Sequence, residues 1–345
     1  MPTVLFAWRR TPPPFLIGGA EVTQQLLAEE FRAAGWSVLY LGTHQPPWDA
    51  AASELPMMRR HLALQGVPCE QQDDELHYQW KGITCHAVPQ PAVEEALCHA
   101  LDRVSPDLVI TAQEGAADLC AMGRRTSRVV GILHSVSETG LGVLHGVPHH
   151  ALAVSHFVAT RARPHPDTGL IVLHPPFVKP VLKDDPRTGD LLMINPVAAK
   201  GSALLHRLIR RLPDRHFTLV EGWWDTAEEF AGYDNVSHVP RTYDMTPLYA
   251  RHRLLLVPSA VEDAFPRVII EAGLCGLPTL GARRGGIPEA LGGSGMALPY
   301  DDTEAWTHAI QTADQAELGA RARRRAKQLT RPCLPELAAA GVLDR

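Results

Sequence analysis

Two acidic residues near the C-terminal end of the chain have a spacing that suits a ligand carrying sugar hydroxyls and phosphate groups. Asp263 lies in a polar loop after the apolar run Leu254–Val257, which has the length of a buried parallel strand. Glu271 follows eight positions later, within a predicted helix over Arg267–Leu274. A helix N-terminus offers N–H groups to phosphate, and carboxylates accept hydrogen bonds from hydroxyls. Either acid alone is more simply explained as solvated or locally paired, but the combination indicates a binding site.

Two further loops bring backbone N–H groups or a cation to the ends of predicted strands. Gly18-Gly19 precedes a predicted helix over Ala20–Ala34, and Lys200-Gly201 precedes a predicted helix over Ser202–Leu212. Helix-start N–H groups and a lysine ammonium group both suit phosphate. A Gly-Gly turn or a surface lysine is commonly structural when it occurs alone. We count both as candidate ligand contacts because each belongs to the same repeated pattern of strand, loop and helix.

A histidine also follows a predicted buried strand. His134 comes directly after the apolar run Val129–Leu133, at the sheet edge where the Gly18-Gly19 loop is expected. A single histidine in this position is either a functional group or an edge residue with ordinary hydrogen bonds, and both interpretations stay open.

Neither of two other polar groups predicts a metal site. His145, His149 and His150 are close in sequence but lack a second cluster with ligand spacing. Asp73-Asp74-Glu75 precedes a predicted β-hairpin over Leu76–Val88, which turns at Lys81-Gly82. We interpret this acidic stretch as a solvated turn, and we expect no bound metal.

Composition excludes several classes of protein. The 345 residues suggest about two domains, and the 45% hydrophobic and 21% charged fractions are ordinary for a well-cored soluble protein. A net charge of -5 gives no electrostatic case for nucleic acid. The basic stretch Arg321–Lys327 is interpreted as a solvated helix face, which leaves a peripheral membrane contact open. No apolar run has the length of a membrane span, and the six cysteines form no C-x-x-C pair, so we expect a cytoplasmic protein.

Strands and helices alternate along the chain in two similar halves, which predicts an α/β protein with parallel sheets. Residues 1–175 are predicted to form the first domain, and the proline-rich stretch 176–190 is predicted to be a linker. Residues 191–325 are predicted to form the second domain, and 326–345 a C-terminal tail that packs back on the first. A further helix is predicted over Pro46–Gln65.

The sequence resembles the family 4 glycosyltransferases, which are retaining enzymes of the GT-B fold. The family's acid-x7-Glu pattern is matched by Asp263 and Glu271 in DAFPRVIIE, and its Gly-Gly-x-Pro-Glu loop by residues 285–289. Its Gly-Gly-x-Glu opening is matched at Gly18-Gly19-Ala20-Glu21, and its Lys-Gly pair at Lys200-Gly201. The resemblance implies two doubly wound Rossmann-like domains with an interdomain cleft. It also implies transfer of a sugar from a nucleotide diphosphate sugar to an acceptor.

The resemblance further implies roles for individual residues. Glu271 would hold the nucleotide ribose, Asp263 the hydroxyls of the donor sugar, and His134 would orient that sugar. Lys200 and the Gly18-Gly19 amides would stabilise the departing diphosphate, so that no metal and no cofactor other than the donor co-substrate is expected. The catalytic residues implied are His134, Lys200 and Asp263. The implied donor-binding residues are Gly18, Gly19, Asn195, Lys200, Asp263, Ala264, Phe265, Pro266, Arg267, Val268 and Glu271.

Three positions depart from the family pattern. Asp263 stands where relatives usually have Glu, Pro266 where they usually have Gly, and Asn195 where they usually have Arg. Pro266 removes one backbone donor. The alternatives are a sugar-nucleotide epimerase or phosphorylase on the same fold, and an inactive nucleotide-sugar-binding scaffold, which the changes at Pro266 and Asn195 favour. The acceptor, the donor sugar, its base and the oligomeric state cannot be read from the sequence.

Overall fold

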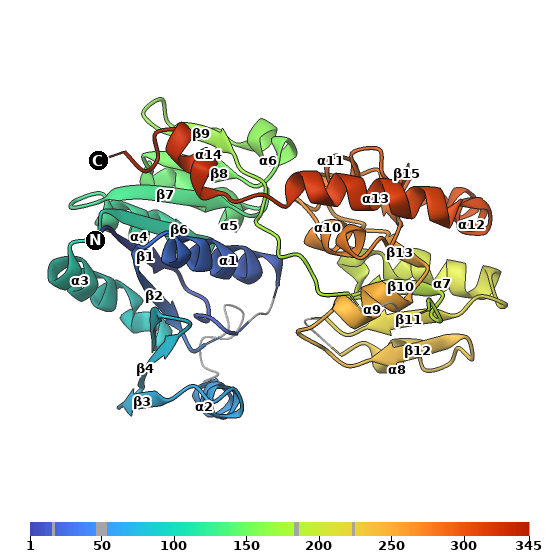
Figure 1. Ribbon diagram of the computed structural model, residues 1–345, viewed down its shortest axis with the longest axis horizontal. Coiled ribbons are helices and arrows are strands. Elements are labelled where there is room, and N and C mark those ends of the chain that lie inside the picture. The colour runs from blue at the N-terminus through green and yellow to red at the C-terminus, as the bar shows by residue number, and fades with distance from the viewer. Residues whose placement is uncertain (16–17, 46–53, 183–185, 223–224, 345) are drawn as a thin grey trace. The chain divides into compact units, whose positions relative to one another are not determined.

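The computed structural model of the chain describes residues 1–15, 18–45, 54–182, 186–222 and 225–344. The chain divides into two compact units, each with its own parallel α/β sheet (Figure 1). The first unit comprises Met1–Pro176 together with Pro332–Arg345, and the second comprises Phe177–Arg331. Within the described ranges, no helix combines the length and the apolar character needed to cross a membrane.

The first unit contains a sheet in the order β3-β4-β5-β2-β1-β6-β7-β8-β9. All neighbouring strands are parallel except β3–β4 and β4–β5, which are antiparallel. The strands are β1 (Thr3–Ala7), β2 (Ser37–Thr43), β3 (Cys69–Gln72), β4 (Glu75–Trp80), β5 (Ile83–Val88), β6 (Leu108–Ala112), β7 (Arg128–Leu133), β8 (His150–Ala153) and β9 (Gly169–Val172). The helices are α1 (Gly19–Ala33), α2 (Leu55–Leu64), α3 (Val93–Val104), α4 (Ala116–Gly123), α5 (Glu138–Leu141), α6 (His156–Arg161) and, after the second unit, α14 (Leu334–Ala339).

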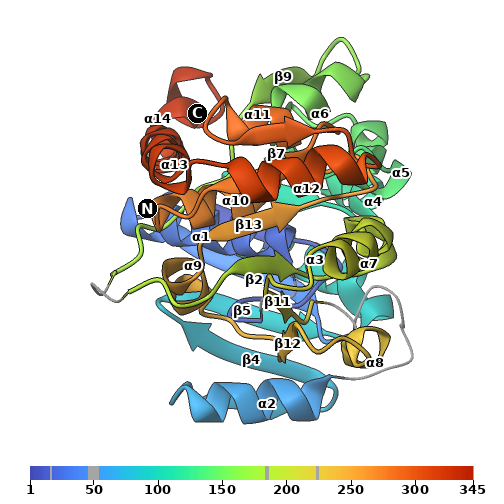
Figure 2. The ribbon, with the colours of Figure 1, turned by 90° about the vertical axis from the view of Figure 1, so that its right-hand side faces the viewer.

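The second unit contains a six-stranded sheet in the order β12-β11-β10-β13-β14-β15, parallel throughout. Its strands are β10 (Leu191–Ile194), β11 (Phe217–Val220), β12 (Val236–Val239), β13 (Leu254–Val257), β14 (Thr279–Ala282) and β15 (Met296–Leu298). Its helices are α7 (Ser202–Arg211), α8 (Ala227–Phe230), α9 (Thr246–Arg251), α10 (Arg267–Leu274), α11 (Ile287–Leu291), α12 (Thr303–Thr312) and α13 (Gln315–Leu329). Helix α13 packs against α10, which in turn lies against β13 and β14 (Figures 1 and 2).

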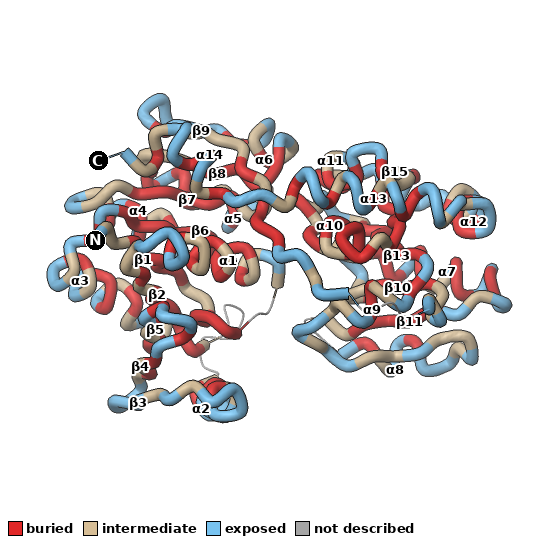
Figure 3. Tube along the Cα trace, viewed as in Figure 1, coloured by how far each residue is buried: buried red, intermediate tan, exposed pale blue. Residues whose placement is uncertain are grey.

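The composition of the central strands is consistent with parallel sheets that are covered by helices on both faces. Every residue of β6 and of β13 is buried, and Figure 3 shows the buried core along the middle strands of each unit. Continuous apolar runs without alternation are typical of strands that helices cover on both faces. The predicted strands Val129–Leu133 and Leu254–Val257 are thereby confirmed, the first beginning one residue earlier.

Each sheet has one point at which the strand order reverses. In the first unit the chain builds outward from β1 through β2, then returns to place β6 on the other side of β1. In the second unit β10 and β13 form the corresponding pair. The carboxyl ends of two such strands diverge into separate loops, and open α/β sheets bind ligands in the space between those loops. A ligand-binding site is therefore expected at the loops after β1, β6, β10 and β13.

The C-terminal residues 332–345 belong to the first unit. The backbone N–H of Cys333 donates to Glu30 Oε2 at 2.7 Å, and Arg128 Nη1 donates to the carbonyls of Gly341 and Val342 at 2.9 and 3.1 Å. Figure 1 shows α14 near β7 and β8, strands that lie far from it in the sequence. The chain therefore ends on the unit in which it began.

Two expectations about the region before β5 need adjustment. The hairpin is confirmed as β4 and β5, with positive φ at Lys81 and Gly82 in its turn. The acidic stretch before it was interpreted wrongly at its last residue, because Glu75 is the first residue of β4 and pairs in register with Gln72 of β3. The predicted helix over Pro46–Gln65 is observed over Leu55–Leu64, and residues 46–53 lie outside the described residues.

Candidate functional site

Lys200 and Asp263, predicted from separate motifs, contact each other at the strand-order reversal of the second unit. Lys200 lies in the loop after β10, and Asp263 lies in the loop after the neighbouring strand β13. The Lys200 ammonium group forms an ion pair with Asp263 Oδ1, and Ser259 donates its hydroxyl hydrogen to Asp263 Oδ2. The side chains are 28% and 13% exposed, so both groups can still reach a ligand. A cation and an anion therefore lie side by side where an open parallel sheet binds ligands.

Two glycines bring the backbone of the surrounding loops close to this pair. Gly201 has φ +98°, and a Cβ atom there would lie 2.0 Å from the carbonyl oxygen of Pro258. A Cβ atom on Gly286 would lie 1.9 Å from the carbonyl oxygen of Ala264, and the Gly286 N–H donates to the Asp263 carbonyl at 2.6 Å. Only glycine permits such close approaches. The loops after β10, β13 and β14 are thus joined around the Lys200–Asp263 pair.

Glu271 is held by its own set of contacts on α10. Arg267 Nε donates to Glu271 Oε1 at 3.1 Å, and the Tyr249 hydroxyl donates to Oε2 at 3.2 Å. Arg267 is buried at 7% exposure and its guanidinium group lies 4.5 Å from the centroid of the Phe177 ring. Burial, together with the charge of Glu271, raises the pKa of Tyr249 well above its ordinary value, so its hydroxyl stays protonated and able to donate. The Glu271 carboxylate is thereby fixed in orientation while its side chain remains 30% exposed.

Burial alternates along the predicted donor-binding segment from Ala264 to Val268. Phe265 and Arg267 are buried, whereas Ala264, Pro266 and Val268 are half-buried. Pro266 is the residue before the first turn of α10, and its own side chain makes no capping hydrogen bond. The Phe265 side chain belongs to the core, so any contact of this residue with a ligand would come from its backbone.

Asn195 occupies a confined position at the end of β10. Its backbone has φ +56°, a conformation that asparagine tolerates better than most residues. A Cβ atom on Gly222 would lie 2.2 Å from Asn195 Cγ, so the backbone after β11 approaches this side chain closely. Within the described part of the chain, Asn195 Oδ1 is buried and has no hydrogen-bond partner. This oxygen is therefore an unsatisfied acceptor at the carboxyl edge of β10.

The remaining predicted residues belong to the first unit. Gly18 is the extended residue before α1, and Gly19 is the first residue of that helix. His134 directly follows β7 and is half-exposed. The residues predicted for one site are therefore distributed over both units, and the contacts described above are those within the second.

Sequence reasoning missed a charged network at the strand-order reversal of the first unit. Arg10, after β1, donates from Nε and Nη2 to the two carboxylate oxygens of Glu114, at 2.9 and 2.8 Å. Its Nη1 donates to Glu21 Oε1 at 2.7 Å, and Glu21 is only 3% exposed. Burial alone would lower the pKa of Arg10, but the hydrogen bonds and charges of Glu114 and Glu21 outweigh it and raise that pKa. The available signal was an arginine three residues after the strand Thr3–Ala7 and a glutamate two residues after the strand Leu108–Ala112.

Comparison with known protein families relates the second unit to sugar transfer. Residues 193–314 match the family model described as "Glycosyl transferases group 1". The D-inositol 3-phosphate glycosyltransferase of Saccharomonospora viridis is 38% identical over 69 residues. That alignment covers 19% of this chain and 16% of the length of the relative. The part of the chain that resembles this family therefore lies within the second unit.

Solved structures extend the likeness to the whole chain. A sucrose-phosphate synthase from Thermosynechococcus elongatus has a TM-score of 0.71 and 19% identity, over 99% of this chain and 96% of that one. HepE from Anabaena, in complex with UDP and glucose, has a TM-score of 0.71 and 16% identity, over 99% of both chains. The pneumococcal O-GlcNAc transferase GtfA, in complex with UDP and GlcNAc, has a TM-score of 0.71 and 12% identity, again over 99% of both. These neighbours, together with the two parallel-sheet units, establish the GT-B fold.

Proposed function

We propose that this chain is a retaining glycosyltransferase, which transfers a sugar from a nucleotide diphosphate sugar to an acceptor without needing a metal ion. The observation that supports this most directly is the contact between Lys200 and Asp263 at the β10–β13 reversal, within the residues that match the glycosyl transferases group 1 model. One cation and one anion at the carboxyl edge suit the two halves of such a donor, its diphosphate and its sugar hydroxyls.

In this proposal Lys200 exchanges Asp263 for the donor diphosphate. Bond breaking at the sugar places negative charge on the diphosphate, and a positioned ammonium group stabilises that charge as it develops. Asp263, released from the lysine but still accepting from Ser259, takes hydrogen bonds from the sugar hydroxyls. Asn195 Oδ1 is a second acceptor on the β10 side. The helix starts of α7 and α10 add N–H groups, as expected for phosphate at helix N-termini.

Glu271 is proposed to bind the ribose of the nucleotide. Arg267 and Tyr249 already fix both of its carboxylate oxygens, so the group is positioned before the ligand arrives. A carboxylate oxygen has lone pairs for more than one donor, and the exposed part of Glu271 can therefore accept from ribose hydroxyls as well. The first unit is proposed to supply the Gly18-Gly19 amides, His134 as an orienting group, and the acceptor site.

The test begins with a thermal-shift screen of the full chain against nucleotide sugars, because a ligand that binds only the folded state raises Tm by mass action. UDP-glucose and UDP-GlcNAc come first, since two structural neighbours are complexes of UDP with glucose and with GlcNAc. Glu271→Ala should abolish the shift while leaving the unliganded protein folded. The matched control is Glu228→Ala, an exposed acid on α8 of the same unit. An unchanged shift in Glu271→Ala would remove the ribose assignment.

Measurements of turnover separate transfer from the epimerase and scaffold alternatives. Each donor that binds should be incubated with a broad acceptor panel, and the release of nucleoside diphosphate and the anomeric configuration of the product should be measured. Retained configuration in a glycosylated acceptor supports the proposal. Free nucleotide with an altered sugar and no acceptor would indicate an epimerase, and donor binding without turnover would indicate a scaffold.

A further inference from the structure

The hairpin β4–β5 in the first unit has two chemically different faces. Leu76, Tyr78 and Trp80 alternate along β4 and are buried, so that face belongs to the core. Glu75 and His77 lie on the opposite face, because successive side chains of a strand point to opposite sides. His86 of β5 is the register partner of His77 and shares its face. Three potential metal ligands therefore come together from two adjacent strands.

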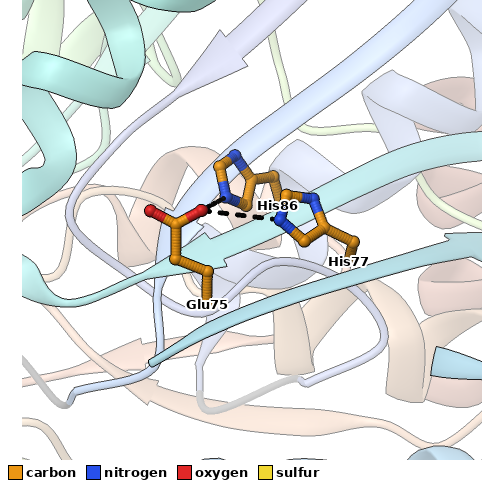
Figure 4. A group of neighbouring side chains, drawn as sticks. All are labelled: Glu75, His77 and His86. Carbon is orange, nitrogen blue, oxygen red and sulfur yellow. Dashed lines mark hydrogen bonds and ion pairs between the residues drawn. The ribbon is translucent and has the colours of Figure 1, made fainter. Parts of the chain in front are cut away.

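Figure 4 shows the side chains of Glu75, His77 and His86 pointing toward one another. Glu75 Oε2 lies 2.8 Å from His86 Nε2 and 3.5 Å from His77 Nε2, and each residue offers one ligand atom within 4.8 Å of the other two. The imidazole rings stack with centroids 4.0 Å apart and planes at 22°. The Nε2 atom of His77 is buried and, among the described residues, has no hydrogen-bond partner. Buried polar atoms normally have a hydrogen-bond partner, so the lack of one at this nitrogen makes it a candidate metal ligand.

These separations fit a small divalent ion. Zn²⁺ binds imidazole nitrogen and carboxylate oxygen at about 2.0–2.2 Å in tetrahedral geometry, which places neighbouring ligand atoms roughly 3.3 Å apart. These two separations lie on either side of that value, and all three ligand atoms lie within 4.8 Å of one another, so side-chain movements would be needed to place them around one ion. Two imidazoles and one carboxylate suit zinc and similar transition metals, whereas Ca²⁺ and Mg²⁺ prefer sets of oxygen ligands.

We propose that the β4–β5 hairpin binds one zinc-type divalent ion through Glu75, His77 and His86, with water completing the coordination. The site would tie two strands of the first unit together and stabilise that unit. It is independent of the proposed transfer reaction, for which no metal is invoked.

The charged residues around the site influence its expected affinity for a metal ion. Glu70 of β3 is the register partner of His77 and adds negative charge on the same face, where Gln72 donates to its Oε1 at 2.8 Å. Arg103, in the last turn of α3, acts on His86 with its positive charge and opposes a cation there. One carboxylate ligand with one favourable and one opposing neighbour predicts moderate affinity, below that of a closed structural zinc site.

The test uses the full chain, stripped of metal with EDTA and dialysed, and titrated with ZnCl2 by calorimetry. One equivalent should bind, and ZnCl2 at 100 times the Kd should raise Tm by about 5–10 °C. CoCl2 should give the intense visible absorption of a tetrahedral cobalt centre. If the three side chains only interact with one another and bind no ion, this absorption will be absent. Absence of both signals in the wild-type protein would overturn the proposal.

Variants separate loss of a ligand from loss of the fold. Glu75→Gln keeps the shape of the side chain and removes the anionic ligand, while His77→Ala removes the imidazole whose Nε2 has no hydrogen-bond partner among the described residues. Each should weaken zinc binding at least about 100-fold and abolish the cobalt spectrum. The control is His99→Ala, an exposed histidine of α3 outside the hairpin, which should bind as the wild type does. Undiminished binding in Glu75→Gln and His77→Ala, or an equal loss in His99→Ala, would assign the ion to another site.

Discussion

The two sheets place a cation against carboxylates at the same topological position, yet the two networks differ in how firmly they are held. In the first unit Arg10 makes three hydrogen bonds, two of them bidentate to Glu114, and its second partner Glu21 is 3% exposed. In the second unit Lys200 makes one ion pair with Asp263 and is 28% exposed. Among contacts with described residues, the first cation is almost saturated by protein groups, and the second has ammonium hydrogens left to donate.

This difference follows from the chemistry of the two cations. A guanidinium group is a rigid planar fork that pins the two loops it bridges, whereas an ammonium group on a flexible stem is a point charge that can change partners. The first network therefore fixes loops, and the second can exchange its carboxylate for a ligand. Stability should depend mainly on the Arg10 network, and ligand binding and turnover on the Lys200 pair.

The largest effect is expected from Arg10→Met. Removing the guanidinium leaves the buried carboxylate of Glu21 without a counter-charge, so we expect a loss of about 3–5 kcal/mol in the free energy of unfolding. Urea denaturation followed by circular dichroism would measure it. The double variant Arg10→Met with Glu21→Gln should be less destabilised than Arg10→Met alone, because no unpaired charge remains. If Arg10→Met changes the free energy of unfolding very little, the Arg10 network does not stabilise the fold, and the contrast with the Lys200 pair fails.

Lys200→Ala should act on turnover instead of stability. If the ammonium group stabilises charge on the departing diphosphate, kcat/KM should fall about 10²- to 10³-fold with little change in Tm. Initial rates with the donor found in the screen, and calorimetry with the bare nucleoside diphosphate, would measure the two consequences. Lys327→Ala, an exposed lysine on α13, is the control. Unaltered diphosphate affinity in Lys200→Ala would count against the assignment.

The smallest of the three effects is expected from Gly286→Ala, which tests whether a close backbone approach positions the site in the second unit. Gly286→Ala forces the backbone at Ala264 to move, because the added Cβ atom would lie 1.9 Å from that carbonyl oxygen. A displacement of about 1 Å at a positioned group should weaken donor binding or turnover roughly 10- to 100-fold. Gly232→Ala, where an added Cβ atom meets nothing within 4 Å, should behave as the wild type. Equal donor affinity in the two variants would show that this close approach does not position the site.

Sequence reasoning located the candidate site in the second unit because its residues follow apolar runs. Lys200 and Asp263 each lie a few residues after a buried strand, and Glu271 falls on the predicted helix α10. A buried strand, a loop and an amphipathic helix are visible in neighbouring residues, so their carboxyl edge could be inferred without knowing how the strands pair. The roles of these residues toward a donor remain proposals.

Contacts between distant residues could not be inferred in the same way. Arg10 and Glu114 are 104 positions apart, and nothing in either neighbourhood indicates that β1 and β6 are adjacent. The interpretation of Glu75 was wrong for a related reason. Its stretch is polar enough for a turn, but pairing with β3 extends the strand and turns the carboxylate toward His86.

The sequence by itself determined the elements and their buried faces, since apolar periodicity and glycine or proline boundaries act over a few residues. It also determined which side chains follow strand ends, and so which groups could serve a phosphorylated sugar. The tertiary structure decided which of those groups touch. Strand order placed Lys200 against Asp263, joined Arg10 to Glu21 and Glu114, and set His77 opposite His86. These contacts depend on which distant segments become neighbours, and that choice is made by the packing of the whole unit.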